Sequence, residues 1–284
     1  MSNNKDIKNK IISELEYYNE NGSINDSDGL ITSLSDYTWS YSKLKTIINS
    51  HYNFLMSFLK PFEDTRATII GKVIHAMIQQ DEEYRYAEKK FNGNTKAGKQ
   101  EAAEAAANGV KLLTTTDMDI VRSVAKSINR NKDVEDLLVG GFKIEQWLTM
   151  EYDGFNFGGY IDVMTDDYAV EIKTTDSIDK DSMTRKFTNY DYQLQAYLYS
   201  KITKKPIKYI ICETSFPHRV IVTEPNEDYL AYGKMRFDKS VNELVNLLDN
   251  VSNGCISNYI DVDDGKLGIS SWDARTLENY SREN

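Results

Sequence analysis

Apolar residues in the first half of the chain recur at the three- and four-residue spacing of amphipathic helices. Residues 21–36 are mostly turn formers, so a loop is expected there. Pro61 follows one helical segment and is expected to end it. The spacing predicts helices over residues 4–20, 40–59, 68–80, the Ala/Glu-rich part of 88–111, and roughly 117–129.

The middle of the chain changes to the short apolar runs that are typical of β-strands. Asp153-Gly154 is a strong hairpin signal. The expected strands cover about 142–151, 155–164 and 168–174, and later 208–213 and 219–223. Helices are expected over 182–202 and 228–248. This order of elements predicts one mixed α/β (α+β) domain with a helical N-terminal half.

Length and composition fit an ordinary globular protein. The chain has 284 residues, 40% of them hydrophobic, which is enough for one large domain with a sizeable core. No apolar run approaches the roughly 20 residues of a membrane span, and the N-terminus has no signal-peptide pattern. The two cysteines, Cys212 and Cys255, are isolated, so a reducing cytoplasm is the expected compartment.

The net charge of -10 argues against a protein that coats nucleic acid by bulk charge. It does not exclude a nuclease, because a metal site adds acidic residues locally and a basic channel can lie on an acidic body.

Two carboxylates and an amine come close together in the predicted strands. Asp162 lies on one strand, and Glu171-Ile-Lys173 lies on the next. Mg²⁺ binds few protein carboxylates and keeps several water and substrate oxygens, which suits Asp162 and Glu171. Lys173 leaves the same sheet face as Glu171 and can orient or deprotonate a water, or hold developing negative charge. The pattern indicates a metal-dependent nuclease site.

A solvated strand edge would explain an acidic residue followed by lysine equally simply. The apolar neighbours Val170 and Ile172 favour a packed strand instead, with the charges on the opposite face. Gly158-Gly159 leaves room for backbone or substrate to approach.

Four further residues are candidates from their positions. His75 is either a core-boundary histidine or a neutral imidazole ligand for the same metal. Glu145, near the start of the first strand, and Gln193 and Tyr197, which share a helix face, are either site residues or surface and packing residues.

Two motif-like stretches are rejected as ligand sites. Residues 93–99 have the GxxxxGK spacing of a phosphate-binding loop, but Gln100 replaces the required Ser or Thr and no apolar strand precedes it. Lys96 and Lys99 are instead expected at the surface or on the DNA backbone. Residues 261–265 lack the glycine position and terminal glutamate of a calcium loop.

Five motifs occur in an order that resembles the RecB-like branch of the PD-(D/E)xK nuclease superfamily. They are Gly71-x-x-x-His75, Glu145, Gly159-x-x-Asp162, Glu171-x-Lys173 and Gln193-x-x-x-Tyr197. Within that branch the chain is most similar to the exonuclease VIII (RecE-like) nuclease domain of phages and prophages. Residues 50–54, the basic loop at 95–99, 213–220 and the segment around Trp272 carry that similarity.

The resemblance implies a restriction-endonuclease-like core, with a central mixed sheet flanked by helices. It also implies a Mg²⁺-dependent 5′→3′ exonuclease, for which Mn²⁺ can substitute, acting on double-stranded DNA ends in phage-type recombination. The implied partners are a single-strand annealing protein and further copies of the chain in a ring-like oligomer. Some relatives carry a four-cysteine iron–sulfur cluster, and two cysteines exclude one here.

The same resemblance assigns roles to individual residues. His75, Asp162, Glu171 and the Ile172 carbonyl would bind metal, and Lys173 would be catalytic. Three further residues would support the site or contact DNA: Glu145, Gln193 and Tyr197.

The expected organisation is an N-terminal extension over residues 1–35, the nuclease domain over 36–250 and a tail over 251–284 that packs on or extends it. Two other functions stay open: an endonuclease or repair nuclease of the same fold, and a DNA-binding or scaffold protein without catalysis. The presence of Asp162, Glu171 and Lys173 together disfavours the last.

Overall fold

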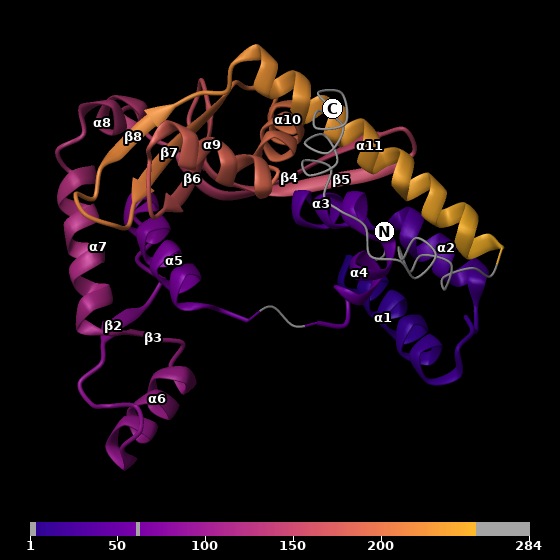
Figure 1. Ribbon diagram of the computed structural model, residues 1–284, viewed down its shortest axis with the longest axis horizontal. Helices are drawn as coiled ribbons and strands as arrows, with labels where there is room; N and C mark the ends of the chain where they lie inside the picture. The colour runs from indigo at the N-terminus through magenta and orange to yellow at the C-terminus, as the bar shows by residue number, and fades with distance from the viewer. Residues whose placement is uncertain (1–3, 61–62, 254–284) are drawn as a thin grey trace, which may run out of the picture.

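The computed structural model describes residues 4–60 and 63–253 (Figure 1). Its helices are α1 (Asn4–Asn21), α2 (Ser27–Asp36), α3 (Tyr41–Asn49), α4 (His51–Met56), α5 (Arg66–Gln79), α6 (Lys96–Ala107), α7 (Thr115–Ile128), α8 (Lys132–Leu138), α9 (Lys180–Asn189), α10 (Tyr192–Thr203) and α11 (Glu227–Ser252). Its strands are β1 (Thr38–Trp39), β2 (Tyr86–Glu88), β3 (Lys111–Leu113), β4 (Lys143–Tyr152), β5 (Phe155–Met164), β6 (Ala169–Thr175), β7 (Ile207–Glu213) and β8 (Val220–Thr223).

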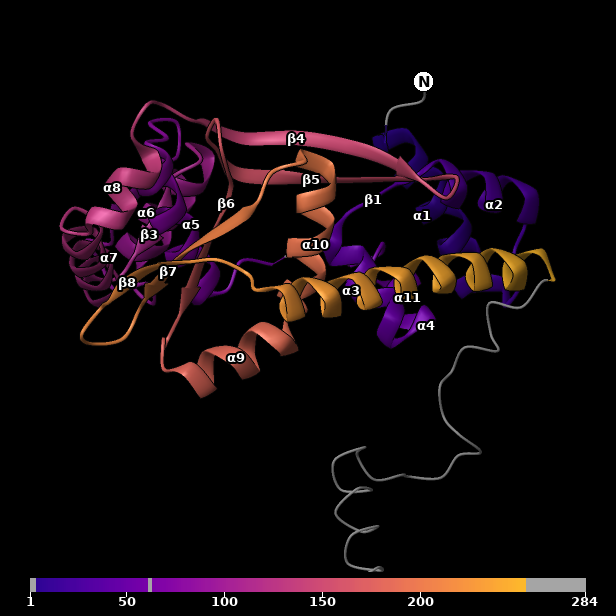
Figure 2. The ribbon, with the colours of Figure 1, turned by 90° about the horizontal axis from the view of Figure 1, so that it is seen from above.

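Strand β5 organises the main sheet. Strand β4 pairs antiparallel with it from one end to the other, and the two run side by side along the molecule (Figure 2). On the other edge of β5, β1 pairs parallel near Phe157 and β6 pairs antiparallel at Val163 and Met164. Strand β7 is parallel to β6, and β8 is antiparallel to β7. The central mixed sheet with flanking helices confirms the predicted fold class.

Two apolar cores lie around this sheet. One is formed with α5, α7 and α8, through residues such as Ile74, Val124 and Val134. The other is formed with α10, α11 and the N-terminal helices, through residues such as Leu194 and Leu244. A small parallel sheet of β2 and β3 extends with α6 as an arm below α7 (Figure 1).

The loop expected over 21–36 is wrong, because residues 27–36 form helix α2. Asp26 caps it by accepting a hydrogen bond from the Gly29 amide. Leu30 and Leu34, one turn apart, are buried in the main core. Few apolar residues stand among the turn formers of this segment, so its helical spacing was not recognised in the sequence, and packing of the helix on the core stabilises it.

Two long predicted helices are each divided in two. The segment 40–59 is broken at Ser50, which is extended and caps α4. The segment 182–202 is broken at Asp191, whose backbone is left-handed with φ 56°. Helix α8 and the short strands β1, β2 and β3 were not predicted, because segments of two to seven residues carry little periodic signal.

The N-terminal helices belong to the main core. Ile7, Ile11 and Leu15 of α1 are buried with residues of α11 in one apolar cluster. Packing therefore does not separate residues 4–35 from the rest of the domain. The expected tail from residue 254 on, with Trp272 and Cys255, lies outside the described residues.

Candidate active site

Strands β5 and β6 separate at the position where the acidic residues lie. Their backbone pairing ends at Val163 and Val170. Beyond that point Asp162 continues the connection with its side chain, because Oδ2 accepts a 2.8 Å hydrogen bond from the Ile172 amide. A carboxylate thus takes the place of a backbone acceptor, and this opens the sheet beside Glu171 and Lys173.

Glu171 and Lys173 form a buried pair on β6. The Lys173 ammonium donates to Oε2 of Glu171 at 2.8 Å, and Glu171 is 1% exposed. Their alternate positions on one strand direct both side chains to the same face, as the sequence predicted. A second donor, the Gln195 amide of α10, reaches the same oxygen at 2.8 Å.

Helix α5 places His75 against this cluster. Nδ1 of His75 lies 3.6 Å from Oδ2 of Asp162. Gly71, one turn earlier, permits this approach, since a Cβ there would lie 3.1 Å from the Thr174 hydroxyl. Burial lowers the pKa of His75, against the raising effect of Asp162. A neutral imidazole is the form that binds a metal.

Glu145 lies across from Asp162, on the edge strand β4. The flanking partners Ile144↔Val163 and Gln146↔Ile161 set this register. Glu145 has φ 47°, and Oε1 accepts a 2.7 Å hydrogen bond from the Gln79 amide, which also donates to the Asp162 carbonyl at 2.8 Å. Gln79 was not singled out from the sequence, although it lies one turn after His75 on the same helix.

The pair on α10 that meets the cluster is Gln195 and Tyr199. Gln193, two residues earlier, instead donates to the Thr188 hydroxyl at 3.0 Å. Tyr197 packs its ring 5.6 Å from that of Phe237 on α11. Two residues correspond to about 200° around a helix, so Gln193 and Tyr197 point away from Glu171. The structure places both outside the cluster.

The space at Gly158-Gly159 is filled by the protein's own rings. A Cβ on Gly159 would lie 2.4 Å from the ring of Tyr199, and one on Gly158 would lie 2.8 Å from the ring of Trp147. The glycines therefore admit aromatic side chains against β5, where the sequence suggested room for backbone or substrate. Burial raises the pKa of Tyr199, and the nearby charge of Glu171 adds to that rise.

Lys96 and Lys99 are exposed residues in the first turn of α6, and this helix lies in the arm, away from β6 (Figure 1). Packing explains Gly98, because a Cβ there would lie 2.0 Å from the Asn92 carbonyl oxygen, whereas Gly93 has no atom within 4 Å of an added Cβ. Their contact with DNA stays a prediction.

The cluster contains two carboxyl groups and one amine, whose pKa values depend on one another. Burial and the Asp162 carboxylate raise the pKa of Glu171 to about 8, although Lys173 opposes this. Burial alone would lower the pKa of Lys173, but Glu171 and Asp162 outweigh it and raise the pKa, so Lys173 stays an ammonium. A bound cation would favour the ionised form of Glu171, because it places positive charge beside two carboxyl groups that are close together.

The donor set fits a divalent metal. Within the described residues, Oε1 of Glu171 is buried without a hydrogen-bond partner. The N–H and C=O of a residue in a strand point to the same side, so the Ile172 carbonyl also points toward Asp162. With His75, these are the hard oxygen and imidazole donors that such an ion takes. Over residues 4–60 and 63–253, however, no three His, Cys, Asp or Glu side chains already form a metal-binding group.

Comparison with known proteins places the chain in a family. The model of the "PDDEXK-like domain of unknown function (DUF3799)" matches residues 40–253. No curated protein sequence is similar enough to count as a match.

In the described part of the chain, no helix is both long enough and apolar enough to cross a membrane.

Two solved structures are similar in fold. The crystal structure of a "putative exonuclease" from Eubacterium rectale has a TM-score of 0.54 at 13% identity, over 86% of this chain and 94% of that one. A phage-related exonuclease from Haemophilus somnus 129PT has a TM-score of 0.29 at 12% identity, over 69% of this chain and 99% of that one. Only the first has a TM-score above 0.5, and at 13% identity it supports the fold alone.

Proposed function

The chain belongs to the PDDEXK-like family that matches residues 40–253, and from this premise we propose that it is a metal-dependent deoxyribonuclease acting on double-stranded DNA ends. One observation carries the proposal. His75, Asp162, Glu171 and Lys173, from α5, β5 and β6, meet where the two strands separate. The similar structure from Eubacterium rectale is described as a putative exonuclease, which agrees with this proposal.

The chemistry of phosphodiester hydrolysis explains why these groups are needed together. Mg²⁺ or Mn²⁺, when bound, would neutralise charge on the phosphate and activate a water. Asp162, Glu171, His75 and the Ile172 carbonyl would hold the ion. Glu145 and Gln79 fix Asp162 from the other side, through the Asp162 carbonyl.

Lys173 has a defined part in this proposal. Its raised pKa keeps the proton on Nζ, so it acts as a cation rather than as a base that takes a proton from water. An ammonium at this position orients the water and stabilises the negative charge that develops on the phosphate. Gln195 shares Oε2 of Glu171 with Lys173 and so keeps the carboxylate in one orientation.

The resemblance of the motifs supports the finer parts of the proposal. These finer parts are 5′→3′ polarity, a role in phage-type recombination, a ring-like oligomer, and a single-strand annealing protein as partner. The proposed compartment is the cytoplasm. An endonuclease of the same fold would use the same residues and differ only in access of DNA to the site.

The test compares linear duplexes, each blocked at one end, with closed circular DNA in Mg²⁺, Mn²⁺ or no divalent ion. We expect metal-dependent release of nucleotides from open ends, intact circles, and loss of activity in Lys173→Ala with an unchanged circular dichroism spectrum. Cleavage of closed circular DNA would show an endonuclease and would rule out the proposed exonuclease. Full activity of Lys173→Ala, or cleavage without metal, would overturn the site.

A further inference from the structure

A pocket of about 560 Å³ opens directly beyond the catalytic cluster. Thr174 and Thr175, which follow Lys173 on β6, form part of its wall. The volume lies within the roughly 300–1,000 Å³ of pockets that bind small ligands. No residue proposed to bind metal lines it, so the pocket is distinct from the metal-binding residues.

Two tyrosine rings connect this pocket to Lys173. The Lys173 ammonium lies 4.9 Å from the ring centroid of Tyr192. The ring of Tyr192 in turn lies 5.6 Å from that of Tyr190, at an angle of 30° between the ring planes. Both rings line the pocket, and Tyr190 is 52% exposed. The Lys45 ammonium lies 5.8 Å from the centroid of the Tyr190 ring. A ring that is half exposed beside two cations offers surface on which a flat ligand can stack.

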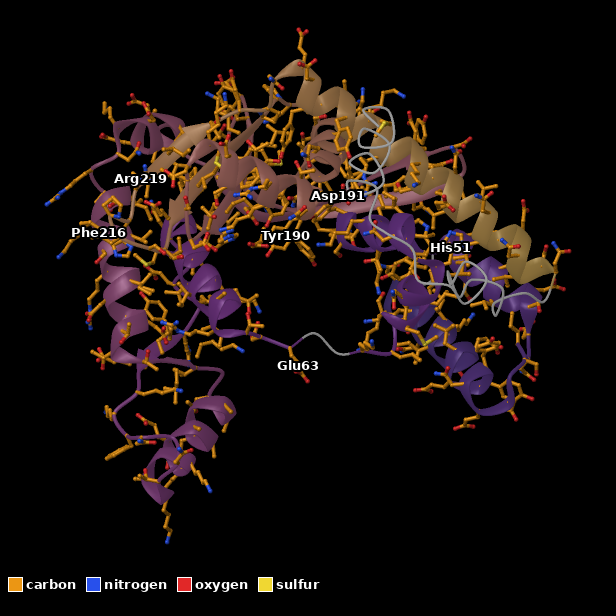
Figure 3. The ribbon with its side chains drawn as sticks, in the orientation of Figure 1. His51, Glu63, Tyr190, Asp191, Phe216 and Arg219 are labelled. Atoms are coloured by element: carbon orange, nitrogen blue, oxygen red, sulfur yellow. The ribbon has the colours of Figure 1, made fainter. Side chains whose placement is uncertain are left out.

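The turn that carries Tyr190 is held in place on both sides. The Tyr41 hydroxyl donates a hydrogen bond to the Tyr190 carbonyl. The next residue, Asp191, is left-handed and buried, and Arg236 of α11 binds its carboxylate through two hydrogen bonds of 2.8 and 2.5 Å. Figure 3 shows Tyr190 and Asp191 next to each other near the middle of the molecule. The buried ion pair of Asp191 and Arg236 thus fixes the turn that exposes the ring of Tyr190.

The remaining wall of the pocket is mixed in character. Its apolar side chains are Ala67, Ile70, Ile120 and Phe187, Asp176 is acidic, and the other groups are hydroxyls and cations. It includes the hydroxyls of Thr174, Thr175, Thr214 and Ser215, and the cations Arg66 and Lys186. Both cations form ion pairs with acidic side chains, with Asp117 and Asp176 respectively. Arg66 is the more accessible, with 63% of its side chain exposed, and a phosphate can compete for such an exposed cation. A flat aromatic face beside hydroxyls and cations matches the base, sugar and phosphate of one nucleotide.

We propose that this pocket binds one unpaired nucleotide of the DNA end, next to the scissile phosphate, with its base stacked on Tyr190. The inference rests on the proposed nuclease function, and it specifies how the end of the DNA strand is held next to the catalytic cluster. A base inside a duplex presents no free face, so stacking on Tyr190 requires that the end be opened by at least one base pair. The ring contacts any of the four bases, and the site is therefore tolerant of sequence.

The experiment measures binding of duplexes whose end carries either a base or an abasic nucleotide at each of the first three positions of one strand. The full chain is used, with Ca²⁺ in place of Mg²⁺ and gels to verify that the DNA stays intact. Stacking on an aromatic side chain predicts that Tyr190→Ala weakens binding by about 5- to 100-fold. An abasic nucleotide at one position should weaken wild-type binding by a similar factor.

Combining the Tyr190→Ala variant with the abasic DNA distinguishes loss of stacking from a general loss of binding. Tyr190→Ala together with the abasic nucleotide should be no weaker than either alone, because both remove the same contact. Tyr190→Phe keeps the ring and should bind as the wild type does. Tyr17→Ala, at a 40% exposed tyrosine on α1, is the matched control and should have no effect. A 2-aminopurine base at the sensitive position should be quenched by wild type and Tyr190→Phe only.

Independent losses from the variant and the abasic nucleotide, or no sensitive position, would overturn the inference. That failure is separable from failure of the nuclease proposal. If wild type hydrolyses DNA in a Lys173-dependent manner but shows no coupling, only the stacking inference falls. If coupling is found without hydrolysis, the pocket stands as a DNA-end site and the nuclease proposal falls.

Discussion

The side-chain amide of Gln195 lies 2.8 Å from Oε2 of Glu171 and donates a hydrogen bond to it. This contact joins α10 to β6 at the centre of the cluster, and both residues are buried. It leaves Oε1 as the oxygen of Glu171 that has no partner within the described residues, and so as the oxygen available to a metal ion.

Gln195→Ala is expected to lower kcat by about 10- to 100-fold, because residues that orient metal ligands commonly contribute that much. Gln193→Ala is the matched control, since Gln193 is on the same helix and equally buried at 6% exposure, but bonds Thr188. Steady-state kinetics in Mg²⁺ would measure both variants. A larger loss in Gln193→Ala would show that the placement of α10 does not describe the working site.

Glu171→Gln is expected to stabilise the metal-free protein at pH 8. The pKa of the Glu171 carboxyl is raised from 4.5 to about 8, so the folded state binds its proton more tightly than the unfolded state does. That stability is present below pH 4.5 and is lost as pH rises toward 8. The amide cannot ionise, so Tm in EDTA at pH 8 should rise by a few degrees, which corresponds to about 1 kcal/mol.

The same variant reports on the metal. Added Mg²⁺ should raise the Tm of the wild type at pH 8 but leave Glu171→Gln unchanged, because a bound ion stabilises only the form that holds it. Glu151→Gln, at the exposed end of β4, should behave as the wild type does. An equal response of all three proteins would contradict the metal assignment of Glu171.

Gly159→Ala is expected to reduce both stability and activity. The new methyl would lie 2.4 Å from the ring of Tyr199, which is buried and cannot move freely. Overpacking of this kind costs about 1–3 kcal/mol. Gly93→Ala, at a glycine with no atom within 4 Å of the added Cβ, should be neutral. Thermal unfolding and nuclease rates would be measured, and a neutral Gly159→Ala would contradict the packing of Tyr199 on β5.

Arg219→Met is expected to destabilise the protein at pH 7, because it removes the hydrogen bonds to a buried carboxylate. Arg219 holds both oxygens of Glu213 at 2.8 and 2.7 Å and lowers the pKa of that carboxyl from 4.5 to about 2. Its contribution is therefore present above pH 4.5 and disappears as pH falls toward 2. Urea unfolding of both proteins should show the difference shrinking from pH 7 to pH 3, and a constant difference would refute the assignment.

The sequence by itself determined the chemical groups and their local setting. The alternation on β6 directs Glu171 and Lys173 to one face, and the helical spacing before it places His75 one turn after Gly71. The hairpin signal at Asp153-Gly154 marks the start of β5, which carries Asp162. Each of these follows from periods of two or 3.6 residues, which act within a single element.

Only the tertiary structure decided which side of α10 meets the cluster. Gln193 and Gln195 are equally buried, because α10 is packed between the sheet and α11, and a helix buried all round has no polar face to mark its orientation. The separation of β5 from β6 and the left-handed turn at Asp191 also depend on contacts between distant residues, such as Asp162 with Ile172 and Asp191 with Arg236. Contacts between residues far apart in the chain leave no periodic pattern in the sequence, so they are seen only in the folded structure.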